Sequence, residues 1–231
     1  MQHLILLHGA VGAKDQLELI ANSLTKDFTI HLINFSGHGG EPIPDINFSI
    51  DLFAGDVLNY MQINQVEKAN IFGYSMGGYV AMYMAKYHAE KVNRVITLAT
   101  KFHWDESVAA REIKMLNADI IQQKLPAFAQ QLVSRHSPND WKKVLEKTAE
   151  LLKALGSNNT LQPGDYSAVT VPCLILLGDR DKMVTLDETV AVYKQLTNAQ
   201  LGILPNASHP VEQVNLQCLT FFIKQFLAEW T

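Results

Sequence analysis

The stretch Gly73-Tyr74-Ser75-Met76-Gly77 decides the fold, because it joins two segments of different character. The apolar run Ala69-Asn70-Ile71-Phe72 precedes it, and residues 78–85 follow it with a helical pattern. A strand, a sharp turn and a helix in this order hold a serine hydroxyl above the edge of a sheet. The two glycines fit this interpretation, since such a turn strains the serine backbone and leaves no room for neighbouring side chains. Ser75 is therefore the predicted nucleophile.

Strand and helix patterns alternate on both sides of this turn. Short apolar runs predict strands at residues 3–7, 28–35, 69–72, 92–99, 171–177 and 200–204. Helical patterns lie between them at about 17–24, 50–61, 78–85, 186–196 and 211–230, with Asn47 or Ser49 as the cap of the second helix. The first helix should bury Leu17, Leu19, Ile20, Ala21 and Leu24. Strands that are apolar on both faces and separated by helices indicate an α/β fold, with a mostly parallel sheet of about six strands covered on both faces.

No strand pattern occurs between residues 100 and 171, a gap far longer than an ordinary connection. Residues 105–115 and 119–134 have helical patterns, and Pro126 should kink or restart the second of these helices. A third helix is predicted to start at Ser137-Pro138-Asn139-Asp140 and to end before Gly156. Its apolar stripe consists of Val144, Leu145, Thr148, Leu151, Leu152 and Leu155. Because ligands bind at the carboxyl edge of open α/β sheets, residues 101–165 predict a helical lid over the pocket rather than an appendage that only adds core.

Length and composition limit the function classes. The 231 residues suit a single domain, 1–231, that contains this insertion. A net charge of −4, with both signs interspersed, predicts neither a nucleic-acid nor a membrane partner. Met1-Gln2-His3 lacks a basic region, and the apolar stretch after it is too short for a signal peptide or a membrane span, so we expect a cytoplasmic protein. Oligomeric state has no signature in the sequence.

The cysteines and the wider residue pattern give no reason to expect a bound metal or cofactor. Cys173 and Cys218 have neither the spacing of metal ligands nor that of a redox pair. We expect both to be buried, inert thiols.

Two later loops complete a pattern that resembles the α/β-hydrolase fold family, from His8 to His209 and so over nearly the whole chain. In that family the nucleophile is followed by an acid and then by a histidine. Here Ser75 is followed by Gly178-Asp179-Arg180-Asp181-Lys182-Met183-Val184 and then by Asn206-Ala207-Ser208-His209-Pro210, each after a predicted strand. The resemblance implies a triad of Ser75, Asp181 and His209. Residues far apart in the chain can meet in this way because the strand ends of a parallel sheet converge.

The resemblance also implies which of two aspartates is the acid. Family members carry G-x-x-D and an apolar residue three positions later, which Gly178, Asp181 and Val184 match. Asp179 is then a turn residue that binds backbone amides. The family pattern further implies an oxyanion hole formed by the backbone N–H groups of Met76 and Ala10, the latter following the His8-Gly9 turn.

The other histidines are weaker candidates for the base. His38 lies in a loop that resembles a structural Gly-His-Gly turn of the family, and His8 belongs to the loop that resembles its oxyanion loop. His88 lies at a helix end, where a surface role is expected. His103 and Trp104 leave the fourth strand towards the pocket and could contact substrate or simply pack.

A serine at the turn, in place of the aspartate of dehalogenases and epoxide hydrolases, implies acyl transfer. The resemblance points to a serine hydrolase that cleaves a small carboxylic ester or thioester through an acyl-enzyme on Ser75. One alternative is a triad-dependent lyase that resembles the menaquinone-pathway member of the family and requires a basic pocket. Its candidate cations are Arg111, Lys114, Lys124 and Arg135. A second alternative is a ligand receptor that keeps the fold without turnover.

Overall fold

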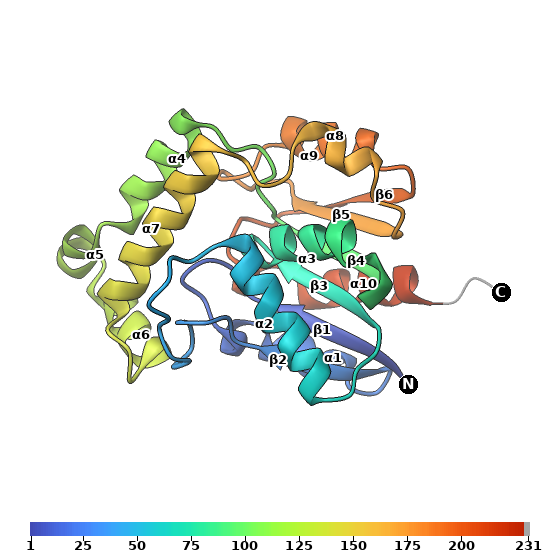
Figure 1. Cartoon of the computed structure of the whole chain (residues 1–231), viewed down its shortest axis with the longest axis horizontal. Coiled ribbons are helices and arrows are strands. Elements are labelled where there is room, and N and C mark those ends of the chain that lie inside the picture. Colours follow the sequence, from blue (N-terminus) through green and yellow to red (C-terminus); the bar gives the residue numbers. More distant parts are fainter. Residues whose placement is uncertain (229–231) are drawn as a thin grey trace.

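One parallel sheet forms the centre of the protein, whose computed structural model describes residues 1–228. Its strands lie in the order β2-β1-β3-β4-β5-β6, and every neighbouring pair is parallel (Figure 1). Their bounds are β1 Gln2–Leu7, β2 Phe28–Ile33, β3 Ala69–Tyr74, β4 Val92–Leu98, β5 Cys173–Gly178 and β6 Ala199–Leu204. The predicted six-stranded parallel sheet is confirmed, although β2 ends two residues earlier than expected.

Helices cover both faces of the sheet, and successive residues of β1 show why both faces need cover. Leu4 and Leu6 pack in a core with α1 (Glu18–Leu24) and α10 (Leu216–Leu227). Ile5 and Leu7 point the other way, into a core with α2 (Ile50–Ile63), α3 (Met76–Tyr87) and α9 (Leu186–Gln195). A strand that is buried on both faces reads as a continuous apolar run, as this one does.

Several helix starts follow from side-chain caps. Ser49 accepts the N–H of Leu52 at 3.0 Å and caps α2, which decides between the two predicted caps. Asn215 caps α10 in the same way, through Cys218 N–H at 2.9 Å. The predicted start of α10 at residue 211 is therefore wrong, because a short 3₁₀ turn, Val211–Gln213, precedes the cap. The predicted end at residue 230 lies outside the described residues.

The buried stripe of α1 differs from the prediction at one residue. Leu17, Ile20, Ala21 and Leu24 are buried, whereas Leu19 is 71% exposed. The buried set follows the spacing of three, four and seven residues that one helix face requires, and Leu19 falls on the opposite face.

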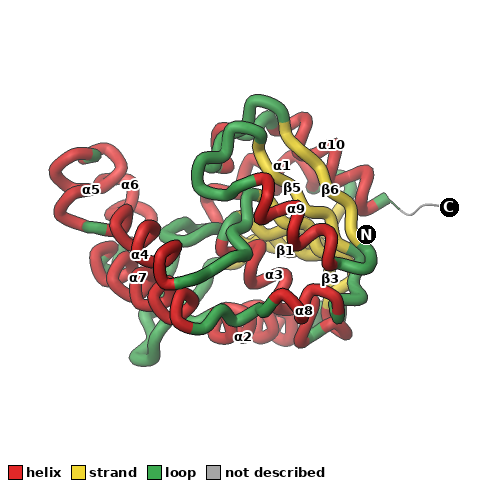
Figure 2. Tube along the Cα trace, turned by 90° about the horizontal axis from the view of Figure 1, so that it is seen from above, coloured by secondary structure: helices red, strands yellow, loops and turns green. Residues whose placement is uncertain are grey.

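The long gap between β4 and β5 is helical, as predicted. It contains α4 (Glu106–Ile113), α5 (Ala118–Lys124), α6 (Pro126–His136), α7 (Trp141–Ser157) and α8 (Pro163–Ser167). Helices α4 to α7 lie beyond the carboxyl ends of the strands, and α8 returns to the side of the sheet beside α9 (Figures 1 and 2). We call α4 to α7, residues 106–157, the helical insertion. Pro126 is the first residue of α6, so it restarts the helix.

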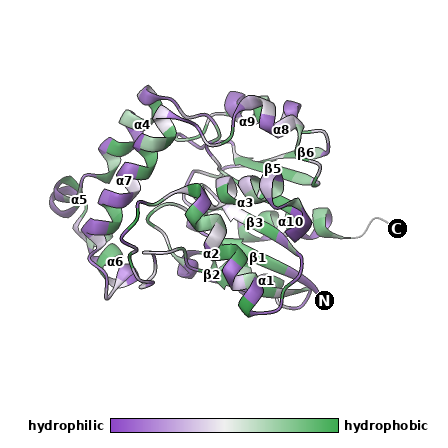
Figure 3. Cartoon of the chain, viewed as in Figure 1, coloured by the Kyte–Doolittle hydropathy of each residue, from purple (hydrophilic) through white to green (hydrophobic). Residues whose placement is uncertain are grey.

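Helix α7 has the predicted apolar stripe but different ends. All six predicted stripe residues are buried, and the hydropathy of α7 alternates along its length (Figure 3). The predicted cap at Ser137 is wrong, since Asp140 caps the helix by accepting Lys142 N–H at 2.9 Å. Gly156 lies inside α7 rather than past its end.

The structure gives another reason for a glycine at position 156. A Cβ there would lie 2.5 Å from the Ala109 side chain and 2.9 Å from the carbonyl oxygen of Asp105. Helices α4 and α7 thus approach closely at Gly156, and this contact fixes the position of one helix relative to the other.

The two cysteines differ in burial. Cys173 is fully buried, and desolvation raises the pKa of its thiol to about 12, whereas Cys218 is only half-buried, unlike the prediction. Within residues 1–228 we find no helix with the length and apolar character of a membrane span.

Gly156→Ala should destabilise the protein, although alanine is by about 1 kcal/mol the better helix former. The added methyl meets backbone and Cβ atoms that cannot rotate away, so we expect a loss of about 1–3 kcal/mol in the free energy of unfolding. Gly55→Ala in α2, where a Cβ would meet nothing within 4 Å, is the matched control and should stabilise by up to about 1 kcal/mol. Urea unfolding measures both, and stabilisation by both changes would contradict the close packing of α4 and α7.

Candidate active site

Ser75 occupies a strained turn between β3 and α3. Its φ of 51° and ψ of −117° lie in a region that non-glycine residues rarely adopt. The backbone is held there by Ser75 N–H, which donates to the carbonyl of Leu98 at 2.8 Å, and by the Thr100 hydroxyl, which donates to the Ser75 carbonyl at 3.1 Å. The neighbouring strand β4 and the residues after it therefore fix the turn.

Two glycines make this turn possible. A Cβ at Gly73 would lie 2.3 Å from the carbonyl oxygen of Gly77, and one at Gly77 would lie 2.4 Å from the carbonyl oxygen of Leu7. Both contacts are with backbone atoms and could not be relieved by side-chain rotation. The predicted reason for these glycines, the close approach of strand and helix, is confirmed.

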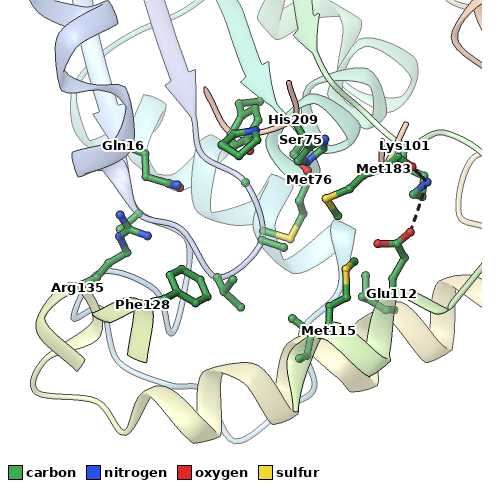
Figure 4. A pocket seen from close by; sticks show the side chains of 18 of the residues that line it. Gln16, Ser75, Met76, Lys101, Glu112, Met115, Phe128, Arg135, Met183 and His209 are labelled. Carbon is green, nitrogen blue, oxygen red and sulfur yellow. Dashed lines mark hydrogen bonds and ion pairs between the residues drawn. The ribbon is translucent and has the colours of Figure 1, made fainter. Parts of the chain in front are cut away.

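Asp181 and His209 form a hydrogen-bonded pair beside this turn. His209 Nδ1 lies 2.8 Å from Asp181 Oδ2, and the two side chains are 13% and 0% exposed. The His209 ring centroid is 5.7 Å from that of Tyr74, the residue before Ser75. Figure 4 shows His209 and Ser75 on the wall of one cleft. The three residues of the predicted triad are thus brought to the same edge of the sheet.

The Asp181 carboxylate is stabilised in its charged form. Burial alone would raise the pKa of this carboxyl, but hydrogen bonds from His209 and from the N–H groups of Val184 and Met183 hold the pKa below its ordinary value. The two backbone bonds, to Oδ1, are 2.9 and 2.8 Å long. An ionised Asp181 accepts a hydrogen bond from His209 Nδ1–H, so that in a neutral ring Nε2 has the free lone pair that can act as a base.

Asp179 has a different role in the same loop. Its Oδ1 accepts the N–H of Ala207 at 3.2 Å, and Arg180 N–H donates to the Ala207 carbonyl at 2.9 Å. These bonds join the loop after β5 to the loop that carries His209. Asp179 binds a backbone amide, as the sequence predicts.

The His8-Gly9-Ala10 turn lies against Ser75. A Cβ at Gly9 would be 2.9 Å from Tyr74 Cε1 and 3.2 Å from Ser75 Cβ, so a side chain at this position would crowd the nucleophile turn. The Gly9 carbonyl accepts from Gly12 N–H at 3.1 Å and from His8 Nδ1 at 2.8 Å. Because C=O and N–H point in opposite directions across a trans peptide, these bonds turn Ala10 N–H the other way. Ala10 lines the cleft together with Met76, the first residue of α3, whose N–H has no partner within the helix.

Three buried histidine rings support this turn. His8 Nε2 accepts Phe35 N–H at 3.2 Å, and the His8 ring centroid is 5.2 Å from that of His38, which in turn is 5.8 Å from that of His136. Desolvation lowers the pKa of all three rings, for His38 to about 4. Neutral rings therefore fill the space between the sheet and the helical insertion.

The cleft in front of Ser75 has a volume of about 1350 Å³ and is lined by the sheet edge and the helical insertion. Its charged lining residues, His209 aside, are four bases and four acids, Lys14, Lys101, Lys114, Arg135, Asp15, Glu18, Glu112 and Glu212. Arg135 pairs with Asp15 at 3.1 Å, and the buried Lys101 lies 3.6 Å from Glu112. Apolar side chains, among them Met115, Met183 and Phe128, make up much of the remaining wall (Figure 4).

The sequence did not decide whether Trp104 and His103 reach the cleft, and the structure places them differently. Trp104 lines the cleft and donates its indole N–H to the Lys101 carbonyl at 3.2 Å. The His103 side chain is 65% exposed, bonds to Asp105 at 3.1 Å and is not part of the cleft wall. Sequence reasoning missed Lys101 and His136. The only signal for Lys101 was its position directly after a strand, and His136 had none, because its partners are more than 90 residues away in the chain.

A parallel sheet with a serine at a strained strand-to-helix turn, beside an aspartate–histidine pair, defines the class of α/β proteins with a hydrolase-like site. Residues 2–118 match the alpha/beta hydrolase fold family, and the chain belongs to that family.

Curated relatives are similar over most of the chain. A pimeloyl-acyl-carrier-protein methyl ester esterase of Chromobacterium violaceum is 27% identical, with 88% of this chain and 83% of the relative covered. A 2-succinyl-6-hydroxy-2,4-cyclohexadiene-1-carboxylate synthase of Serratia proteamaculans is 26% identical over 97% of this chain and 92% of its own. Among solved structures, an enol-lactonase of Burkholderia xenovorans superposes with a TM-score of 0.80 at 20% identity, covering 99% of this chain and 92% of that one.

The buried histidines should make the fold sensitive to acid. An unfolded histidine titrates near pH 6.5, whereas the pKa of His38 in the fold is about 4. Between these values the unfolded chain binds a proton that the folded chain does not, so the free energy of unfolding falls as the pH falls. In His38→Asn this loss between pH 7 and pH 5 should be smaller by about 2 kcal/mol, measured by urea unfolding.

The control for this change is His103→Asn, which replaces an exposed histidine and should keep the pH dependence of the wild type. If His38→Asn lost stability with acid as steeply as the wild type, another group would carry the effect.

Proposed function

We propose that the protein is a serine hydrolase that cleaves a carboxylic ester or thioester through an acyl-enzyme on Ser75. The observation that carries this proposal is the 2.8 Å pair of His209 and the buried Asp181 beside a serine at a strained turn, with Ser75 and His209 lining one cleft. A serine hydroxyl is a poor nucleophile until a neutral imidazole takes its proton. A protein with this geometry has all three groups that acyl transfer requires.

In this mechanism Ser75 Oγ attacks the ester carbonyl while His209 Nε2 takes the serine proton. Asp181 keeps the proton on Nδ1 and stabilises the imidazolium that forms, without taking the proton itself. The tetrahedral oxyanion accepts hydrogen bonds from the N–H groups of Ala10 and Met76. His209 then protonates the leaving alcohol or thiol, and water, activated by the same ring, releases the acid from Ser75.

The cleft wall favours an uncharged ester or thioester. Acidic and basic side chains balance, and two of the four bases, Lys101 and Arg135, are paired with carboxylates. The volume of about 1350 Å³ exceeds that of most small-molecule pockets, roughly 300–1,000 Å³. We therefore propose a substrate with an apolar acyl group held beside Met115 and Met183, with the helical insertion as the lid over it.

The lyase alternative has a named relative in its favour, the Serratia proteamaculans synthase. A polycarboxylate substrate would need unpaired cations in the pocket. Of the four predicted candidates, Arg111 and Lys124 lie outside the cleft wall, and Arg135 is held by Asp15. Lys114 is left as the one candidate that lines the cleft with no ion pair among the described residues. The small number of available cations favours the hydrolase over the lyase, as does the esterase name of the Chromobacterium violaceum relative. A receptor would give one burst of product without turnover, which the kinetics below would reveal.

Ser75→Ala should abolish turnover of p-nitrophenyl acetate and butyrate, with kcat/KM lower by about 10³-fold or more, because no other group can form the acyl-enzyme. Labelling by a fluorophosphonate probe should disappear as well. Ser134→Ala removes another serine of the cleft wall and should leave both signals within about twofold. Equal rates in the wild type and Ser75→Ala would reject the proposal.

Asp181→Asn should lower kcat by roughly 10³- to 10⁴-fold, since the amide cannot stabilise the imidazolium or select its tautomer. Asp179→Asn keeps an oxygen for the Ala207 N–H and should cost less than about tenfold. Initial rates with the same ester compare the two variants. The reverse order of effects would assign the acid to Asp179.

A further inference from the structure

His136, the last residue of α6, connects the helical insertion to two loops of the sheet edge. Its ring is fully buried. Nε2 lies 3.0 Å from the carbonyl oxygen of Val11, and Nδ1 lies 3.2 Å from the backbone nitrogen of Gly39. A carbonyl can only accept and a backbone N–H can only donate, so Nε2 carries the proton and Nδ1 is the acceptor. One neutral tautomer satisfies both partners.

Val11, which accepts the hydrogen bond from His136 Nε2, has an unfavourable backbone conformation that contacts from outside its own turn must stabilise. Its φ of 49° lies in the left-handed region, which is unfavourable for a β-branched residue. Val11 directly follows Ala10, whose N–H is the proposed oxyanion donor. The turn has its own bond from Gly12 N–H to the Gly9 carbonyl, whereas the described bond to the Val11 carbonyl comes from the insertion.

Two other side chains bond the corner between α6 and α7, residues 135–140, to the same edge of the sheet. Arg135 Nε donates to both carboxylate oxygens of Asp15 at 3.1 Å, next to the turn that holds Val11. Asn139 Nδ2 donates to the carbonyls of Gly37 and Glu41 at 3.2 and 2.6 Å, in the loop after β2. The corner thus contacts the Val11 turn through His136, and it contacts the loop after β2 through both His136 and Asn139.

We propose that His136 is a positioning residue that holds Val11, and through it the N–H of Ala10, in the geometry that stabilises the oxyanion. The helical insertion then does more than cover the cleft, since its α6–α7 corner shapes half of the oxyanion hole. This inference rests on the proposed function and adds to it a residue outside the triad and its loops.

Loss of this support for Ala10 should affect the transition state more than the bound substrate. A substrate in the ground state makes weaker contact with the oxyanion donors than the tetrahedral intermediate does, so a displaced Ala10 N–H lowers kcat and leaves KM nearly unchanged. Loss of a whole oxyanion donor costs about 10²- to 10³-fold, which sets the upper limit for its displacement. A residue that only packs the core would change stability without this split.

The test compares His136→Phe and His136→Met, which keep an apolar volume but lose both hydrogen bonds, with His136→Gln, which keeps a donor and an acceptor. With a p-nitrophenyl ester, we expect kcat of the first two to fall about 10- to 100-fold with KM within about threefold. The Ki of a trifluoromethyl ketone, which mimics the tetrahedral intermediate, should rise in parallel. His136→Gln should restore most of the loss.

Asn139→Ala is the matched control, because it removes two bonds of the same corner without touching the Val11 turn, and its kcat should stay within about threefold of the wild type. If His136→Phe does not fold, His136→Met carries the comparison. A folded variant with wild-type kcat and Ki, or an equal loss in Asn139→Ala, overturns the positioning role while the hydrolase stands. A wild type without ester turnover overturns the proposed function itself, and the positioning role with it.

Discussion

The contact of Gly77 with the end of β1 is the constraint on which the rest of the site depends. A Cβ at position 77 would lie 2.4 and 2.6 Å from the carbonyl oxygens of Leu7 and His8, so α3 starts in van der Waals contact with the neighbouring strand. This approach accompanies the strained backbone of Ser75, which lines the cleft. It also sets the His8-Gly9 turn against the serine. The nucleophile and one proposed oxyanion donor are therefore positioned by the same contact.

The parallel sheet supplies the remaining groups at the same edge. The loops after β5 and β6 carry Asp181 and His209, and backbone hydrogen bonds around Asp179 and Ala207 hold these loops together. Loops fixed in this way pre-organise a site, so that little free energy is spent on ordering it during the reaction. The helical insertion lines the other side of the cleft. His136 bonds it to the turn that contains Ala10, and Arg135 bonds it to Asp15, which follows that turn.

Most of the sheet and the loops of the site could be predicted from the sequence because their requirements are local. A glycine at a close approach, an aspartate after a strand and an apolar run leave signatures within a few residues, as at Gly73, Asp181 and 3–7. The helical insertion was harder to predict, since its details depend on distant partners. Gly156 looks like a helix end, but a glycine is needed there because Ala109 lies so close. Ser137 looks like a cap, but Asp140 is the residue that caps α7. The position of His136 depends on its hydrogen bonds to Val11 and Gly39. A local pattern can also mislead, since Leu19 was predicted to be buried with its apolar neighbours but lies on the exposed face of α1.

In the proposed reaction Ser75 carries the acyl group during turnover. The most direct measurement is rapid acid quenching of the protein during turnover of a p-nitrophenyl ester, followed by intact-mass analysis and peptide mapping. We expect a single adduct with the mass of the acyl group, on the peptide that contains Ser75, which forms and decays fast enough to support the observed kcat. Sustained turnover with no adduct, or with an adduct on another residue, would contradict the proposed reaction.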